Sequence, residues 1–200
     1  MTVGSVRGKG ERMPKTITQR IANLDFCFEH SPTQVVANRS CPEIKLAGLT
    51  IGPFEEGNEY EVQYWIAREC ENAGIVRIRD EESLDSSKIF KIQWKERIQT
   101  AGQISKLQDD FYPKLRRYIA ESRKEAIKQP EKMREYEKTK QLAFDIANSR
   151  LRKIVSLASA SAQPDHVLKN LTIEERFLYE QLYTIINNWR TKILEHEGKE

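Results

Sequence analysis

The chain has 200 residues, of which 38% are hydrophobic and 32% charged, with a formal net charge of +3. This length suits one domain of ordinary size or two small ones, each with a buried core. The longest apolar runs are a handful of residues and the start is polar, so we expect no membrane-spanning helix, no secretion signal and no membrane partner. The small net charge with many charged residues favours exposed ion pairs over a dedicated nucleic-acid surface, and any contact with DNA is expected to be local and weak.

The first 20 residues contain three glycines and several basic side chains without an apolar period, which predicts a flexible tail over 1–20. The cysteines Cys27, Cys41 and Cys70 are odd in number and widely spaced, so they support neither a disulfide framework nor a metal knuckle. A reducing compartment is therefore expected.

Residues 21–97 are predicted to form a small β-rich domain with one helix. Short apolar segments typical of strands occur at 25–29, 34–37, 44–46, 75–79 and 89–94, and the last two alternate with a period of two. The one helix is expected over 60–73, where Gly74 ends it.

A turn within this domain is the most informative segment of the chain. Gly52 and Gly57 permit positive φ where the chain must reverse, and Pro53 presets a turn dihedral. Phe54 is then expected to pack against the following helix, which carries Trp65. The predicted role of this turn is packing, without chemistry.

After Lys95 the composition changes to long patterns rich in Glu, Lys, Arg, Leu and Ala, which predicts a linker at 98–104 and a helical domain at 105–200. The fold class is therefore α+β, with a small β-rich N-terminal domain followed by an all-α helical bundle. The first helix is expected from Asp109 or Asp110 to Lys128, with Pro113 in its first turn.

The second helix is expected from Pro130 to about Ala158, a rod of roughly 45 Å whose apolar stripe needs a partner. The third is expected to begin with a capping box formed by Thr172 and Glu175. Its apolar residues exceed one stripe, which indicates contact with two neighbours, one of them another chain.

Of the possible classes of protein, an enzyme is the easiest to reject. His30, His166 and His196 have no metal-site spacing, and no phosphate-binding, nucleophile-elbow or dinucleotide motif occurs. We expect no enzyme activity, no cofactor and no metal.

Basic residues along 114–140 mostly follow an acidic residue by three positions, which predicts exposed i,i+3 ion pairs, such as Glu121 with Lys124 and Glu125 with Lys128. The cluster Arg150, Arg152 and Lys153 lies in an apolar stretch without acids. It is a candidate for contact with a partner carboxylate or with a phosphate, an interpretation as good as that of a solvated face.

Four segments in chain order carry a family resemblance: GPF-x-x-G-x-x-x-x-V-x-x-W-x-A at 52–67, DFY-x-x-L from Asp110, R-x-x-KI-x-x-LA from Arg150, and NLT-x-EE from Asn170. Together they resemble the small domain and the helical domain of GINS subunits, the scaffold proteins of the replicative DNA helicase. The small domain comes first, as in the archaeal class numbered two-three and its two eukaryotic counterparts, and the length of 200 residues favours an archaeal origin.

The resemblance implies a tetramer of related subunits without an active site, which bridges the MCM helicase and a RecJ-like or Cdc-type partner. It also implies contacts with primase or DNA polymerase, and a cytoplasmic location at the archaeal nucleoid, or a nuclear one if the chain is eukaryotic. The expected subunit-interface residues are Phe111, Tyr112, Tyr118, Leu151, Ile154, Phe177, Tyr183 and Trp189.

A second hypothesis from another class is a monomeric basic adaptor that binds nucleic acid. Its phosphate contacts would come from Arg116, Arg123, Arg150, Arg152 and Lys153, and its affinity would fall steeply with salt.

Overall fold

The structure is a computed structural model that describes residues 16–46, 48–79, 83–99, 103–160 and 165–194. Most of the predicted flexible tail lies outside the described residues. The first described element is helix α1 (Ile17–Glu29), so the tail prediction for 17–20 and the strand prediction for 25–29 are wrong. A capping box begins α1: the Gln19 amide donates to Thr16 Oγ1 at 3.3 Å, and the Thr16 amide donates to Gln19 Oε1 at 3.1 Å.

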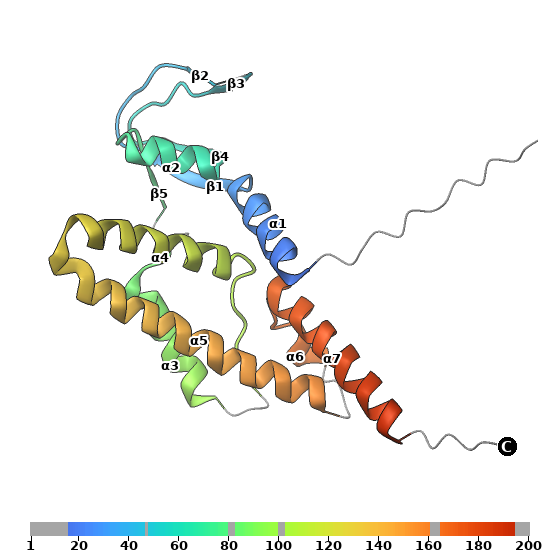
Figure 1. The fold of residues 1–200 in the computed structure, drawn as a ribbon. Coiled ribbons are helices and arrows are strands. Elements are labelled where there is room, and N and C mark those ends of the chain that lie inside the picture. Colours follow the sequence, from blue (N-terminus) through green and yellow to red (C-terminus); the bar gives the residue numbers. More distant parts are fainter. Residues whose placement is uncertain (1–15, 47, 80–82, 100–102, 161–164, 195–200) are drawn as a thin grey trace, which may run out of the picture.

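A three-stranded antiparallel sheet follows, in the order β4 (Glu59–Gln63), β1 (Pro32–Ala37), β5 (Val76–Ile78). Strands β2 (Ile44–Leu46) and β3 (Leu49–Ile51) form a separate hairpin at the edge of the molecule (Figure 1). Helix α2 (Tyr64–Asn72) begins where β4 ends. The predicted helix over 60–73 is therefore strand in its first four residues, because these residues pair with β1.

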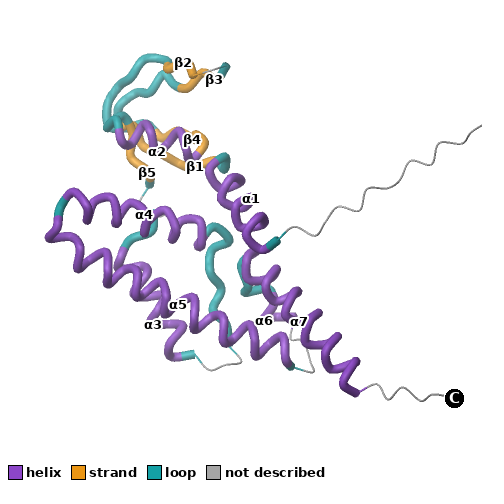
Figure 2. The backbone as a smooth tube through the Cα atoms, viewed as in Figure 1, coloured by secondary structure: helices purple, strands orange, loops and turns teal. Residues whose placement is uncertain are grey.

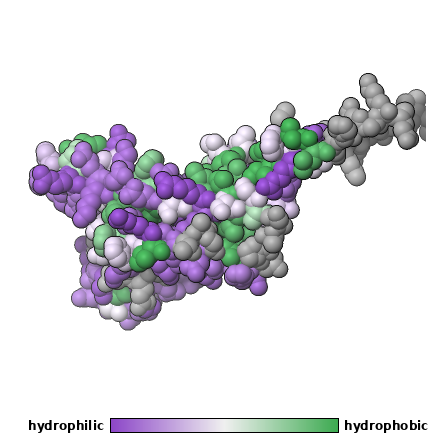
Figure 3. Space-filling model, turned by 90° about the horizontal axis from the view of Figure 1, so that it is seen from below, coloured by the Kyte–Doolittle hydropathy of each residue, from purple (hydrophilic) through white to green (hydrophobic). Residues whose placement is uncertain are grey.

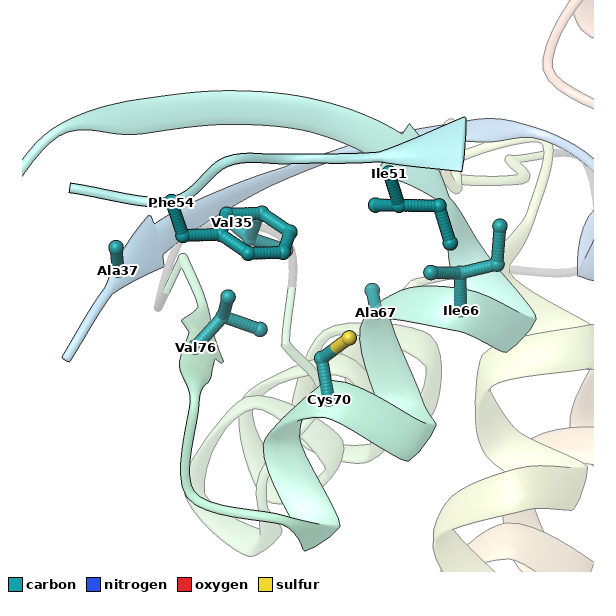
Figure 4. Packing of buried hydrophobic residues seen from close by; sticks show 8 residues of the cluster. All are labelled: Val35, Ala37, Ile51, Phe54, Ile66, Ala67, Cys70 and Val76. Atoms are coloured by element: carbon teal, nitrogen blue, oxygen red, sulfur yellow. The ribbon is translucent and has the colours of Figure 1, made fainter. Parts of the chain in front are cut away.

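The predicted turn packs as expected. Phe54 is only 2% exposed and lies in a buried cluster with Val35, Ile66, Cys70 and Val76 (Figure 4). Gly52 has φ 85°, and a Cβ atom on it would lie 3.2 Å from the Phe54 backbone nitrogen, so both conformation and space favour glycine there. Gly57 also has positive φ, and Trp65 covers the edge of the cluster, half-buried.

The rest of the chain is helical: α3 (Ser86–Ile98), α4 (Phe111–Lys128), the short 3₁₀ helix η1 (Pro130–Lys132), α5 (Met133–Ser159), α6 (Asp165–Leu168) and α7 (Ile173–Leu194). Helices α4 and α5 form an antiparallel hairpin, and α3 and α7 lie against α5 (Figures 1 and 2). The predicted bounds of α4 and α5 and the predicted start of α7 agree with the structure to within a few residues. The predicted fold class, a small β-containing part followed by a helical bundle, is confirmed.

Helix α3 replaces the strand that alternation predicted for 89–94. Asp85 caps it by accepting the Lys88 amide at 2.7 Å. Ile89 is fully buried against the other helices, whereas Phe90 and Trp94 are about half exposed on the opposite side. Apolar residues on both sides of one helix imitate the period of a strand, which is why sequence reasoning failed here.

Because α3 packs into the helical core, we propose that the boundary between the two parts lies near residue 79 and not at 98–104. Two buried clusters hold the bundle together. One joins α3, α4 and α5, with Ile89, Leu107, Phe111, Leu115, Ala143 and Ile146. The other joins α5, α6 and α7, with Ile104, Ile154, Leu157, Ala158, Val167, Leu171 and Tyr179.

Helix α1 links the two parts, since it lies between the sheet and the start of α7 (Figure 1). Arg116 of α4 reaches Asp25 of α1, Nη2 to Oδ1, at 2.5 Å. The Arg20 guanidinium lies 3.9 Å from the centre of the Phe177 ring in α7. These contacts make α1 part of both halves. Among the residues that the structure describes, none of the helices has the length and apolar character that a membrane crossing requires.

Candidate interaction site

A buried ionic cluster sits at the centre of the bundle, around Arg150 of α5. Its side chain has no exposed surface. Its Nη1 donates to Glu96 Oε1 of α3 at 2.7 Å, its Nη2 donates to Glu175 Oε2 of α7 at 2.6 Å, and its Nε also donates to Glu175. Nη1 further donates to the Ser105 carbonyl oxygen at 2.9 Å. One guanidinium therefore joins three helices and the segment before α4.

Lys153, one turn after Arg150, completes the cluster. Its Nζ donates to Glu96 Oε2 at 2.7 Å, and the hydroxyl of Tyr112 donates to Glu175 Oε1 at 2.6 Å. Two carboxylates thus face two cations, which leaves no net buried charge among the four groups.

The environment shifts the pKa values in this cluster. Burial acts to raise the pKa of Glu96, but hydrogen bonds from Lys153 and Ser105 and the charge of Arg150 outweigh it, so this pKa lies below its ordinary value. Burial and the neighbouring Glu175 carboxylate raise the pKa of Tyr112. Glu96 is therefore ionised and the Tyr112 phenol neutral at physiological pH.

This geometry contradicts the predicted phosphate or partner contact for Arg150 and Lys153. Both side chains are buried and paired with carboxylates of the same chain. Arg152 is exposed and has no ion-pair partner among the described residues. Sequence reasoning missed Glu96 because it lies between an expected strand at 89–94 and an expected linker at 98–104, outside the predicted bundle.

The capping box predicted at the start of α7 forms as expected. The Thr172 amide donates to Glu175 Oε2 at 3.0 Å, and the Glu175 amide donates to Thr172 Oγ1 at 3.4 Å. Glu175 therefore serves both the cap and the ionic cluster, and the cap fixes the position of its carboxylate.

Replacing Thr172 with alanine is expected to lower the free energy of unfolding by about 1–2 kcal/mol, because one buried amide at the start of α7 loses its acceptor. Thr172→Ser, which keeps the hydroxyl, is expected to lose less. Urea unfolding followed by circular dichroism measures both. Equal losses for the two variants would show that the methyl group, and not the hydroxyl, is what matters.

The second half of α7 presents an apolar surface that has no partner among the described residues. Its first half packs Leu178, Tyr179 and Leu182 into the cluster shared with α5. Arg190 donates to the carbonyl oxygen of Ser159, the last residue of α5, at 2.7 Å, so α5 ends at this level. The α7 overhang, which we define as Trp189, Ile193 and Leu194, has side chains that are 62–80% exposed.

Trp189 and Ile193 lie seven residues after Leu182 and Ile186, which pack in the cluster shared with α5, so they continue the same side of the helix. Figure 3 shows the molecule from below, with hydrophobic surface gathered toward the side of α1 and α7 and a mainly hydrophilic opposite end. An exposed apolar surface of this kind is typical of a protein–protein contact.

The eight residues predicted for a subunit interface are divided by the structure. Trp189 and Leu151 are exposed, at 62% and 43%, and stay candidates. Phe177 is half-buried beneath Arg20. Phe111 and Ile154 are buried in the core of this chain and Tyr112 donates to Glu175, which speaks against an interface role for these three. Tyr118 and Tyr183 are half-buried at the edges of the two clusters and stay predictions.

Helix α5 adds a second exposed apolar set, formed by Phe144, Leu151 and Val155 at 40–62% exposure. The predicted i,i+3 ion pairs of α4 and α5 do not form among the described residues. Glu121 pairs instead with Arg68 of α2, and Glu125 pairs with Lys132 at 2.8 Å. Exposed pairs contribute little, so longer-range partners compete successfully with neighbours in sequence.

Neither the histidines nor the cysteines form a site in the part of the chain that the structure describes. His30 Nδ1 lies 2.8 Å from the Phe26 carbonyl oxygen at the end of α1, and His196 lies outside the described residues. Within 16–46, 48–79, 83–99, 103–160 and 165–194, no group of three acidic, histidine or cysteine side chains could hold a metal ion.

The sequence also matches a model of a known protein family. The family model for the GINS complex protein helical bundle domain, named Sld5, matches residues 79–194, which is more than half of the chain. No curated protein matches the sequence. The matched range begins before α3 and ends with α7, so it contains the ionic cluster, the capping box and the α7 overhang.

Proposed function

We propose that this chain, which belongs to the GINS family of DNA replication proteins, is a non-catalytic scaffold in a tetramer of GINS subunits. Membership of the family makes it a GINS complex subunit. The proposal adds three finer statements to this membership: the chain forms a tetramer, it has no catalytic activity, and it is archaeal and of the subclass in which the small domain comes first.

The α7 overhang is the observation that carries this proposal. A helix whose packing face continues past the end of its neighbour leaves Trp189 and Ile193 in water within one chain. Tryptophan at the centre of an apolar surface is typical of interface hot spots. A second GINS subunit, docked where α5 ends, covers these residues, and the exposed set on α5 extends the contact.

We further propose that the assembled tetramer binds the MCM helicase and activates it. The mechanism is differential binding: a scaffold that fits one conformation of the helicase ring better than the others shifts its population toward that conformation. RecJ-like or Cdc-type proteins are the proposed second partner, with primase or DNA polymerase as further ones. These partners place the chain with DNA in the archaeal cytoplasm or in a nucleus.

Native mass spectrometry of the tagged chain, recovered from its source cells with every co-purifying polypeptide identified, tests the proposal. The expected GINS particle has a mass close to four times the 23.3 kDa of this chain and contains a second GINS-like polypeptide, and MCM is expected to co-purify with it in a heavier complex. A lone monomer that carries nucleic acid would contradict it and favour the adaptor hypothesis. The burial of Arg150 and Lys153 already removes two of the phosphate contacts that the adaptor needs.

A further inference from the structure

The outer side of α3 carries a surface that neither the bundle core nor the α7 overhang uses. We define the α3 outer face as Phe90, Lys91, Trp94, Lys95, Arg97 and Ile98. Its three apolar members are spaced four residues apart and are 49%, 55% and 64% exposed, in chain order. Residues four apart share one side of a helix, so Phe90, Trp94 and Ile98 form one stripe.

The charges beside this stripe are all of one sign. Lys91, Lys95 and Arg97 are exposed, and none of them has an ion-pair partner among the described residues. The one acidic residue within α3, Glu96, is buried and committed to Arg150 and Lys153. The α3 outer face is therefore apolar and basic without compensating carboxylates of its own.

The stripe continues into a groove between α3 and the first half of α5. Its volume is about 640 Å³, and Phe90 and Leu142 form apolar parts of its wall. The far side of the groove has Glu131 and Glu135 as well as Arg134 and Lys138. A concave apolar wall next to an exposed apolar stripe is the geometry in which an amphipathic helix lays its apolar side.

We propose that the α3 outer face binds an acidic amphipathic helix of a partner protein. The partner's apolar side chains lie along Phe90, Trp94 and Ile98, with one reaching the groove, and its flanking carboxylates face Lys91, Lys95 and Arg97. Charge of one sign on the face selects acidic partners and rejects basic ones.

The stripe itself favours a peptide over a nucleic-acid strand. Stacking of bases needs successive aromatic side chains, and the third residue of the stripe is the aliphatic Ile98. This inference does not depend on the proposed tetramer, because α3 and the α7 overhang are separate surfaces.

Fluorescence anisotropy on the purified full chain, in its native assembly, tests the inference. The probe is a labelled synthetic 18-residue helix with leucines on one side and glutamates on the other. The same helix with lysines in place of the glutamates, and a single-stranded oligothymidylate, are the competing probes. We expect the acidic probe to bind and the other two to bind at least tenfold more weakly. Equal binding of the lysine probe, or preference for the oligonucleotide, would overturn the proposal.

Variants assign the binding to this face. Two variants are expected to weaken the binding of the acidic probe at least tenfold: the double variant Lys91→Glu with Lys95→Glu, and the single variant Trp94→Ala. The matched control is Lys124→Glu with Lys128→Glu on the exposed side of α4, which has the same spacing and is expected to change nothing. Native masses of all variants should equal that of the unaltered chain, so loss of the tetramer and loss of this site are distinguishable. Undiminished binding by the α3 variants would refute the assignment.

Discussion

Replacing Arg150 with alanine is expected to lower the free energy of unfolding by about 3–5 kcal/mol, because it leaves Glu96 and Glu175 buried with too few partners. Arg150→Lys keeps the charge but loses the forked contact to Glu175, so we expect an intermediate loss. Chemical denaturation measures both variants. Arg152→Ala, two residues along and exposed, is the matched control and should stay within about 0.5 kcal/mol of the unaltered chain.

The same cluster predicts how stability depends on pH. The pKa of Glu96 is lower in the folded chain than in the unfolded one, so this carboxylate stabilises the fold above its unfolded pKa, and the contribution disappears as the pH falls through the folded value. Removing Arg150 takes away a cause of the low pKa and should move the acid transition to higher pH. Denaturation midpoints from neutral pH down to about pH 3 measure this. An unchanged transition in Arg150→Ala would show that Lys153 and Ser105 alone hold Glu96 ionised.

The second large effect is expected at the α7 overhang. Trp189→Glu with Ile193→Glu should lower the native mass of the assembly, since two carboxylates replace apolar groups that the proposed neighbour buries. Loss of one tryptophan hot spot costs about 2–4 kcal/mol of binding, and buried unpaired charges add to it, so affinity should fall by about a thousandfold or more.

Thr191→Glu is the control, because it adds a carboxylate to the same helix at an exposed position on its other side. The circular dichroism and denaturation midpoint of the double variant should match those of the control, since neither altered side chain is part of the buried clusters. If the double variant keeps its full native mass, the subunit contact lies elsewhere, and the exposed set on α5 becomes the next candidate.

Sequence reasoning succeeded where one local signal and one tertiary environment agreed. Helix α7 begins with a capping box before a long apolar run, and α4 begins with aspartates before a proline, so the starts of both helices were predictable. The turn at Phe54 was predictable because glycine and proline restrict the backbone before any tertiary contact forms.

Sequence reasoning failed where the two sides of a helix have different environments. In α3 the inner residues face the bundle and the outer ones face solvent, so the apolar pattern lost its helical period. Helix α1 had a usable signal that was overlooked, the pair Thr16 and Gln19 at capping-box spacing. The partners of Arg150 were beyond reach, because Glu96 and Glu175 come from elements far apart in sequence.

That separation has a consequence for how the chain folds. Arg150 meets partners 25 and 54 residues away, so its bonds close long loops, whereas the α4–α5 hairpin is built from neighbouring segments. We expect the hairpin to form early, with Arg150 still in water, and the docking of α3 and α7 to come late. The four charged groups of the cluster then lose their water near the last step of folding. Because the contacts of Arg150 form after the folding transition state, substitutions at Arg150 should speed unfolding and leave the folding rate almost unchanged.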